Sequence, residues 1–516
     1  MGNAFTPASL TALAVVAVLI SAACAYGAQE DQQVNAIGSR RQLFIDDYLI
    51  DSMSSLKRSF HPGRKHGDPL IVPEHPWEGV GTAPWPSTFL FGDVVWDEEE
   101  QLYRMWYTSA TKDEEGQHSV LYATSQDGIQ WHKPLDLGVV SYEGSDANNI
   151  LIRNCSAENV LRREDEPDPG RRYQLFTYDR NVNAYAWRFS ADGIHWTNPV
   201  PVPALHGMWD MANVAYDDTR GIYVLIVKGR HSEDYRHPVL GKHPGVNFRR
   251  WLMATSPDGM EWSPLVDMLG DFDEIDKALY MDGEACAMLN TYGVSLHAYH
   301  GVYLGLQWLF RITDTEGFWS CHGGPMDGRL LFSREWARPW QIPTRQFMLP
   351  RGRKGEWDWG MICGIANRPV LSPDGDQWWY YYGGWDGGHG TSRRRACIGL
   401  AKFRLDGFAS LDTFGTEGLL TTHPLKFQGS VLRLNVNAAG EDTDGVRNFA
   451  QVELLDAQGD VISGHARADS DPIHADSVNH TVTWRGDGNV SDLAGEVIRV
   501  KIYMKGAELY ALQFVP

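Results

Sequence analysis

The apolar positions of this chain fall into short alternating or continuous runs of four to eight residues. Such runs occur at 103–107, 119–123, 173–177, 223–227, 250–254 and 379–382. Turn residues such as Gly, Asp, Asn and Pro separate them, and runs of this length and spacing are typical of β-strands. The pattern predicts an all-β protein.

A seven-residue repeat organises these runs. The sequence Ser-x-Asp-Gly-x-x-Trp occurs at 125–131, 190–196 and 256–262, and weaker copies lie at 333–340 and 405–408. The repeated Asp127, Asp192 and Asp258 are 65 and then 66 positions apart. A Gly in this position favours a tight turn with positive φ, while the Ser and Asp side chains bond to the turn amides.

Each unit of this repeat holds about four strands, as a propeller blade does. Counting units from about residue 80 to residue 412 predicts a five-bladed β-propeller. We expect the propeller to span 36–415, with residues 36–80 covering it. Strand-like runs at 431–436, 452–455 and 498–503 predict a β-sandwich over 416–516.

Composition and charge limit the classes of molecule that this protein is expected to bind. The chain has 516 residues, 20 Trp, 21 Tyr, 52 Gly and a formal net charge of −20. A strongly acidic protein lacks the basic face that binding to nucleic acid requires, so no nucleic-acid partner is expected. An anionic polysaccharide would need a local cluster of basic residues. The sequence does not indicate an oligomeric state.

The N-terminal region predicts export. An apolar run at 10–25 is too short to span a membrane, and it ends in small residues that suit signal-peptidase cleavage. We therefore expect a signal peptide over 1–28 and a secreted or periplasmic protein with no membrane span. The first ten residues carry no Lys or Arg, and Cys24 leaves a lipoprotein as an alternative.

The other cysteines are widely spaced and odd in number, so neither a zinc site nor a disulfide framework is expected. They are Cys155, Cys286, Cys321, Cys363 and Cys397. Buried free thiols are the expected state, with one or two disulfides open as an alternative.

With these blade turns, export signal and C-terminal sandwich, the chain resembles the five-bladed propeller glycosidases, glycoside hydrolase families 32 and 43. The stretch 505–514 is similar to the sandwich that follows the invertase propeller. Two departures place the chain in a divergent branch: blade one lacks the acidic signature of these families, and Glu284-Ala285-Cys286 only loosely matches their Glu-Cys signature. The resemblance implies a glycosidase with no cofactor, and it would allow an axial calcium ion.

Glycoside cleavage uses two carboxyl groups, one as general acid and one as base or nucleophile. We looked for acids at the start of innermost strands, where propeller sites lie. Glu284 is the predicted general acid and Asp210 the base or nucleophile, while Asp358 would orient the substrate or tune the acid. The predicted substrate-binding residues are Trp209, Trp357, Trp385, His389, Glu78, Asp282 and Arg250.

Each of these residues also has a structural interpretation, such as an acid that caps a turn or a His that packs in the core. The leading hypothesis is an exported glycoside hydrolase acting on a poly- or oligosaccharide. A non-catalytic carbohydrate-binding propeller is the alternative that the missing blade-one acid favours. A sialidase-like enzyme is a further alternative, because the turn motif resembles the sialidase Asp-box; it would need three axial arginines and six blades.

Overall fold

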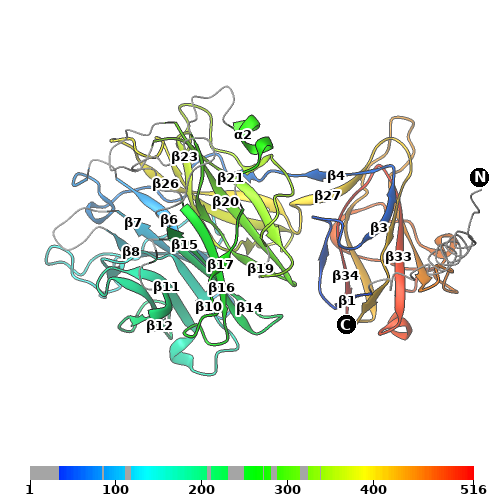
Figure 1. Ribbon diagram of the computed structural model, residues 1–516, viewed down its shortest axis with the longest axis horizontal. Helices are drawn as coiled ribbons and strands as arrows, with labels where there is room; N and C mark the ends of the chain where they lie inside the picture. Colours follow the sequence, from blue (N-terminus) through cyan, green and yellow to red (C-terminus); the bar gives the residue numbers. More distant parts are fainter. Residues whose placement is uncertain are drawn as a thin grey trace, which may run out of the picture.

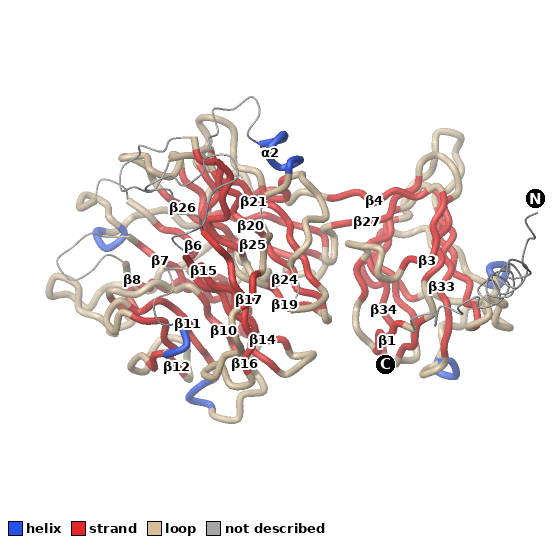
Figure 2. The backbone as a smooth tube through the Cα atoms, in the orientation of Figure 1, coloured by secondary structure: helices blue, strands red, loops and turns tan. Residues whose placement is uncertain are grey.

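The computed structural model describes residues 34–83, 86–110, 118–205, 208, 211–230, 249–270, 272–280, 288–313, 323–336 and 339–516. Two bodies lie side by side, joined by the paired strands β4 (Leu56–Phe60) and β27 (Ala409–Thr413) (Figure 1). Strands dominate both bodies, and helices are short (Figure 2). The one α-helix in the described part is α2 (Glu274–Tyr280).

The larger body is a propeller of five antiparallel sheets, which confirms the predicted fold class and blade count. In chain order, blade one holds β6 (Thr88–Asp97), β7 (Leu102–Ser109), β8 (Ser119–Ser125) and β9 (Ile150–Arg153). Blade two holds β10 (Asn159–Arg162), β11 (Tyr173–Asp179), β12 (Ala184–Ser190) and β13 (Val200–Pro201).

Blade three holds β14 (Ala212–Asp217), β15 (Ile222–Arg230), β16 (Arg249–Ser256) and β17 (Val266–Asp267). Blade four holds β18 (Met288–Val294), β19 (His297–Tyr299), β20 (Val302–Ile312), β21 (Met326–Ser333) and β22 (Phe347–Leu349). Blade five holds β23 (Met361–Ile365), β24 (Val370–Leu371), β25 (Gln377–Trp385) and β26 (Ala396–Arg404).

The fourth strand of blade five comes from the other end of the chain. Strand β5 (Arg64–Lys65) pairs antiparallel with β26, and the backbone N–H of His66 donates to the carbonyl of Leu400 at 2.8 Å. The N-terminal segment therefore closes the ring of blades. Closure of this kind covers part of the outer edge of β26 and leaves only the two-residue strand β5 at the rim of the last blade.

The repeated motifs form the predicted turns. In the first copy, the Asp127 carboxylate accepts the N–H groups of Ile129 and Gln130 at 2.8 and 2.7 Å, and Gly128 has φ +70°. The other two copies repeat these bonds. They lie between the third and fourth strands of their blades.

These turns also join three of the five neighbouring pairs of blades. The indole N–H of Trp106 in blade one donates to the carbonyl of Gly193 in the turn of blade two, at 2.7 Å. Trp187 of blade two makes the same bond to Gly259 of blade three at 2.8 Å. Tyr381 of blade five bonds to Gly128 of blade one at 2.7 Å, so this set of contacts also crosses the point of ring closure.

A ring of amide and carboxyl side chains holds the innermost strands together at the axis. Asp93 of β6 accepts the N–H of Val160 in blade two (3.0 Å) and of Asn367 in blade five (2.9 Å). Asn159 of β10 accepts the N–H of Val214 in blade three at 2.6 Å and the side-chain N–H of Asn367 at 2.8 Å.

The same pattern continues into blade four. The Asn213 side chain of β14 donates to the carbonyl of Val294 in β18, and Asn367 accepts the N–H of Leu296 at 3.3 Å. Each side chain thus bonds to the backbone of an adjacent blade. We call Asp93, Asn159, Asn213 and Asn367 the axial ring.

The smaller body is built on two six-stranded sheets. The first pairs β1 (Asn35–Gly38) and β3 (Ile50–Ser54) with β28 (Gly418–Thr422), β29 (Leu425–Phe427), β31 (Phe449–Asp456) and β33 (Val497–Lys505). The second pairs β2 (Gln42–Leu43), β4 and β27 with β30 (Val431–Asn437), β32 (Asp476–Thr481) and β34 (Glu508–Val515). One apolar core lies between the sheets, so the body is a β-sandwich.

This arrangement differs from the expectation that residues 36–80 cover the propeller. Strands β1 to β4 are part of the sandwich, and Phe44 and Leu49 are buried in its core. Of the described segment 36–80, the part from about His61 onward reaches the propeller. The local sequence predicts a strand in either case. Only pairing with distant strands decides whether this segment belongs to the propeller or to the sandwich.

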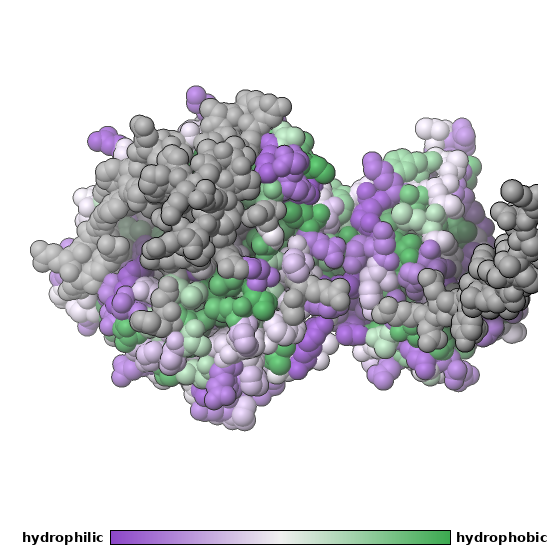
Figure 3. Space-filling view, in the orientation of Figure 1, coloured by the Kyte–Doolittle hydropathy of each residue, from purple (hydrophilic) through white to green (hydrophobic). Residues whose placement is uncertain are grey.

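Hydrophilic side chains gather where the two bodies meet (Figure 3). Arg41 pairs with Asp406 at 2.5 Å, and Arg404 pairs with Asp476 at 2.6 Å. The Asn435 side chain of β30 donates to the carbonyl of Leu405 at 2.6 Å. These bonds fix the sandwich against blade five.

The cysteines of the described part agree with the expected free thiols. Cys155 and Cys397 are buried free thiols, Cys363 is buried as well, and burial raises the pKa of Cys155 to about 12. Cys286 and Cys321 lie outside the described residues, as does the expected signal peptide. Among the described helices, none is long and apolar enough to cross a membrane.

Removing a member of the axial ring should destabilise the whole propeller. Asn159→Ala would leave the backbone groups of Ala212 and Val214 without their partner at a buried site. We expect a loss of about 3 kcal/mol in the free energy of unfolding, measured by chemical denaturation. Asn181→Ala, at an exposed position of the same blade, should change it by less than about 0.5 kcal/mol. Equal effects would contradict the ring's role.

Asp93 should make stability depend on pH. Burial raises its pKa to about 6 from the ordinary value of 3.8, although Arg368 and the N–H donors oppose this. The folded state therefore binds more protons than the unfolded state between about pH 4 and 6. The stabilisation that protonated Asp93 contributes to the folded state is fully present below about pH 4 and is lost as the pH rises through about 6. Relative to Asp93→Asn, the wild type should gain up to about 3 kcal/mol between pH 7 and pH 4.

Denaturation curves of both proteins at several pH values would measure this difference. A constant difference across the range would show that Asp93 keeps an ordinary pKa.

Candidate active site

Aromatic rings fill the axis at the end where the innermost strands begin. Trp308 of β20 stacks on Phe91 of β6, with ring centroids 5.8 Å apart and 13° between planes. It also stacks on Tyr292 of β18 at 6.2 Å and 18°. Trp308 passes over Gly293, where a Cβ atom would lie 2.3 Å from the indole ring. The glycine is therefore required for this side chain to reach the axis.

Three further rings extend this group. Phe89 lies 5.5 Å from Trp385 at the end of β25, and Phe310 lies 6.1 Å from Tyr292. We call Phe89, Phe91, Tyr292, Trp308, Phe310 and Trp385 the axial aromatic cluster. It joins blades one, four and five, and Phe91 of β6 and Tyr292 of β18 are its partly exposed members.

Cationic side chains border the axial aromatic cluster. The Arg249 guanidinium lies 4.8 Å from the centroid of Tyr292 and 5.5 Å from that of Phe310. Lys228 lies 5.1 Å from Tyr292, and Arg394 lies 4.7 Å from Trp385. Burial lowers the pKa of Arg394. The local basic cluster that an acidic sugar would need is therefore present in this acidic protein.

The Gly-rich loop after β25 carries His389 to blade four. Its backbone exchanges hydrogen bonds with Gly324 at 2.8 and 3.1 Å. The imidazole ring lies 5.1 Å from both Tyr292 and Phe310. His389 and Trp385, two of the predicted substrate-binding residues, thus come together at the innermost strands.

The predicted catalytic pair lies outside the described residues. Asp210 and Trp209 precede Met211, where the described chain resumes one residue before β14. Asp282 and Glu284 likewise precede Met288, the first residue of β18. Arg250 lies in β16, and its side chain is outside the described part.

Asp358 and Trp357 differ from their expected place at the axis. The Asp358 carboxylate is buried and accepts from Lys65 of β5 at 2.7 Å and from the Tyr382 hydroxyl at 2.9 Å. Trp357 stacks on Tyr382 at 5.6 Å and donates its indole N–H to the carbonyl of Gly67. Because β5 is the outermost strand of blade five, this pair secures ring closure rather than lining the axis.

Glu78 also has a structural role in place of the expected one. Its side chain is fully buried and accepts from the Tyr107 hydroxyl at 2.9 Å and from Lys133 at 2.9 Å. It also accepts the N–H groups of Glu74 and His75. With all these donors in place, the carboxylate fixes the loop before blade one and has no room for a substrate.

The axial ring was not predicted from the sequence, although a weak signal is present. Asp93, Asn159, Asn213 and Asn367 each follow a Gly, Glu or Ala, and three of them precede Val. Asn159 and Asn213 lie at the start of β10 and β14, Asp93 lies within β6, and Asn367 follows β23. Trp308 was not predicted either, because a Trp inside an apolar run is typical of ordinary core.

The described axial residues do not suit a calcium ion. Calcium takes six to eight oxygen ligands, several of them carboxylates. Asp93 is the one carboxylate of the axial ring, and both its oxygens already accept N–H groups. Within the described ranges, no group of three or more His, Cys, Asp or Glu side chains could hold a metal ion.

The chain was compared with protein families, curated proteins and solved structures. No family model and no curated protein matches the chain. Among solved structures, an N-acetylgalactosamine deacetylase from F. plautii is 16% identical, with 69% of this chain and 97% of that one covered and a TM-score of 0.42. An α-L-arabinofuranosidase from Podospora anserina is 14% identical, with 66% and 97% covered and a TM-score of 0.40.

A third match is a glycoside hydrolase family 43 enzyme from Xanthomonas citri. It is 13% identical, with 68% of this chain and 94% of that one covered and a TM-score of 0.38. The five blades do not fit the sialidase-like alternative, which would need six.

Breaking the Lys65–Asp358 pair should lower stability. Lys65→Met would leave the buried Asp358 carboxylate with only the Tyr382 hydroxyl. We expect a loss of about 3 kcal/mol in the free energy of unfolding. Lys354→Met is the matched control. Lys354 lies at an exposed position of the loop that carries Asp358, so its replacement should leave the free energy of unfolding almost unchanged. An unchanged denaturation midpoint for Lys65→Met would argue that the pair contributes nothing to ring closure.

Proposed function

We propose that this protein is an exported glycoside hydrolase whose active site lies at the end of the propeller axis where the innermost strands begin. The observation that supports this most directly is the axial aromatic cluster with its border of Arg249, Lys228 and Arg394. Aromatic faces stack on sugar rings, and cations bind hydroxyl or carboxylate groups of the sugar.

The chemistry of the proposal rests on the two acids predicted beside this cluster. The segments that carry Asp210 and Glu284 lead directly into β14 and β18, and β18 bears Tyr292. In the proposed mechanism, Glu284 protonates the glycosidic oxygen as the bond breaks. Asp210 either activates water or attacks the anomeric carbon.

The structural roles of Glu78 and Asp358 support the proposal that Asp210 and Glu284 are the catalytic pair. Both carboxylates are buried and occupied by structural donors, so neither is available to a substrate. Of the acids proposed for the chemistry, Asp210 and Glu284 are left. The cations favour a poly- or oligosaccharide that carries an acidic group.

Glu284→Gln and Asp210→Asn should each abolish hydrolysis. We expect the release of reducing ends from the best substrate of a neutral and acidic glycan panel to fall about 1,000-fold, because proton transfer or attack is lost. Unfolding temperatures should stay within about 2 °C of the wild type, since each change is nearly isosteric. Asp146→Asn, at an exposed turn of blade one, is the control and should keep full activity.

Wild-type turnover in either variant would remove that residue from the mechanism. Binding of a glycan by the wild type, with no hydrolysis of any panel member, would favour the carbohydrate-binding propeller. Ser87 and Thr88, where β6 begins, provide no acid, and this observation supports the carbohydrate-binding function as the second candidate.

A further inference from the structure

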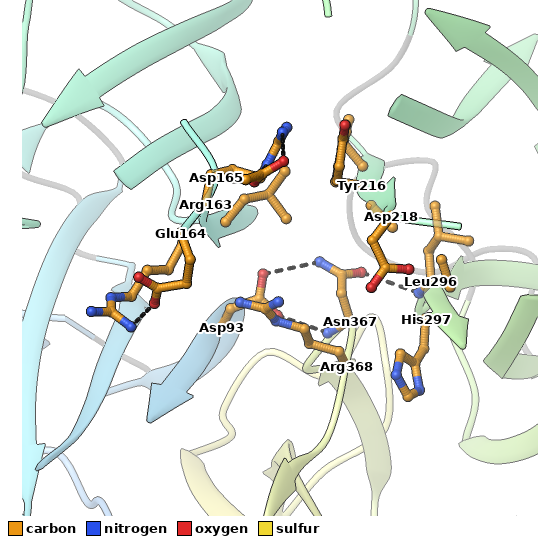
Figure 4. A pocket seen from close by; sticks show the side chains of 15 residues that line it. Asp93, Arg163, Glu164, Asp165, Tyr216, Asp218, Leu296, His297, Asn367 and Arg368 are labelled. Atoms are coloured by element: carbon orange, nitrogen blue, oxygen red, sulfur yellow. Dashed lines mark hydrogen bonds and ion pairs between the residues drawn. The ribbon is translucent and has the colours of Figure 1, made fainter. Parts of the chain in front are cut away.

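A cavity opens at the opposite end of the axis, where the innermost strands finish. Its volume is about 470 Å³, and Asp93 and Asn367 of the axial ring form part of its wall (Figure 4). A second cavity of about 750 Å³ shares Arg162, Glu164 and His297 with it. The two therefore form one groove from the axis toward the turns of blades one and five.

Two of the three arginines in the axial part of the groove are already paired. Arg163 forms two bonds with Asp165, at 2.9 and 3.0 Å, and lies 3.2 Å from the ring centroid of Tyr216. Arg162 pairs with Glu164 and lies 3.4 Å from Asp97. Neither guanidinium needs a ligand.

Arg368 is different. The described part of the chain provides no hydrogen bond or ion pair to its guanidinium, which extends below Asn367 toward Asp93 (Figure 4). Asp93 acts on Arg368 through its charge, but its carboxylate oxygens accept hydrogen bonds from Val160 and Asn367. Burial lowers the pKa of Arg368. Arg368 is partly exposed at the wall of the cavity, so its guanidinium can donate to an oxygen-bearing ligand or to water there.

The surrounding charges decide which ligand is suitable. Four carboxyl groups (Asp93, Glu164, Asp165 and Asp218) and three guanidinium groups line the axial part of the groove. A free anion would bring a further negative charge close to Asp93. A hydroxyl oxygen accepts from a guanidinium without adding charge, and its proton can be donated to a carboxylate.

The groove also supplies the other groups that a sugar uses. Asp218 is exposed at its border, and its carboxylate points into the cavity (Figure 4). His297 is neutral, because burial lowers its pKa to about 3, and its Nδ1 has no hydrogen-bond partner in the described part. In the outer part of the groove, the partly buried Trp96 contributes an aromatic ring.

We propose that this groove is a second carbohydrate site, which binds a neutral saccharide chain by hydroxyl groups at Arg368 and Asp218 and by stacking on Trp96. Its two cavities have the size typical of ligand sites and extend from the axis to the edge of the blades. The axial ring separates it from the proposed active site. The site therefore does not depend on the proposed function and would bind without hydrolysing.

The experiment measures binding in a background without catalysis. Isothermal titration of Glu284→Gln uses neutral tetrasaccharides of glucose, xylose, arabinose, mannose and galactose, with a galacturonic acid tetramer as the acidic arm. At least one neutral tetrasaccharide should bind. Adding Arg368→Gln or Trp96→Ala should weaken that binding about tenfold or more. Arg172→Gln, a partly exposed arginine near blade one that pairs with Glu99, is the matched control and should not change it.

Circular dichroism of each variant establishes that it is folded, and Arg368→Lys keeps the charge if the Gln variant is not. Three results would overturn the proposal. They are the absence of binding by every neutral tetrasaccharide, binding by the acidic tetramer alone, and equal affinity with and without Arg368→Gln. The last would place the sugar elsewhere. Wild-type hydrolysis is measured separately, so failure of the groove and failure of the active site give different results.

Discussion

The axial ring is the interaction on which the rest of this structure depends. Five blades that each bury an innermost strand leave backbone groups at the axis where water is scarce. Asp93, Asn159, Asn213 and Asn367 satisfy those groups, and each bonds to a neighbouring blade rather than to its own. Short amide side chains do this within a narrow axis, where longer side chains would force the blades apart.

The ring also divides the propeller axis into two ends. Toward the start of the innermost strands, rings and cations meet in the axial aromatic cluster. Toward their finish, Arg368 and Asp218 face a groove with a mixed set of charges. Each end is built from several blades, so its geometry depends on the closure that β5 and the turn contacts provide.

In such a fold, a buried acidic residue can act either as a structural hydrogen-bond acceptor or as a catalytic group. Glu78 and Asp358 have the residue type and the neighbouring Trp that a glycosidase site needs, yet buried donors occupy both. A carboxylate that accepts hydrogen bonds from Lys and Tyr donors in this way is not available to a substrate. The same burial that makes these acids look like site residues makes them structural.

The sequence by itself determined the repeating unit. Each Ser-x-Asp-Gly turn is closed by bonds within seven residues, so its shape needs no distant partner, and three copies 65 and 66 residues apart set the blade count. The C-terminal sandwich strands were also predicted from their alternation. Tertiary structure decided the rest: whether 36–60 pairs with the propeller or the sandwich, where Lys65 meets Asp358, and how Trp308 crosses Gly293. These pairings join residues that lie far apart in the sequence. A local sequence pattern does not determine which of several similar strands will pair.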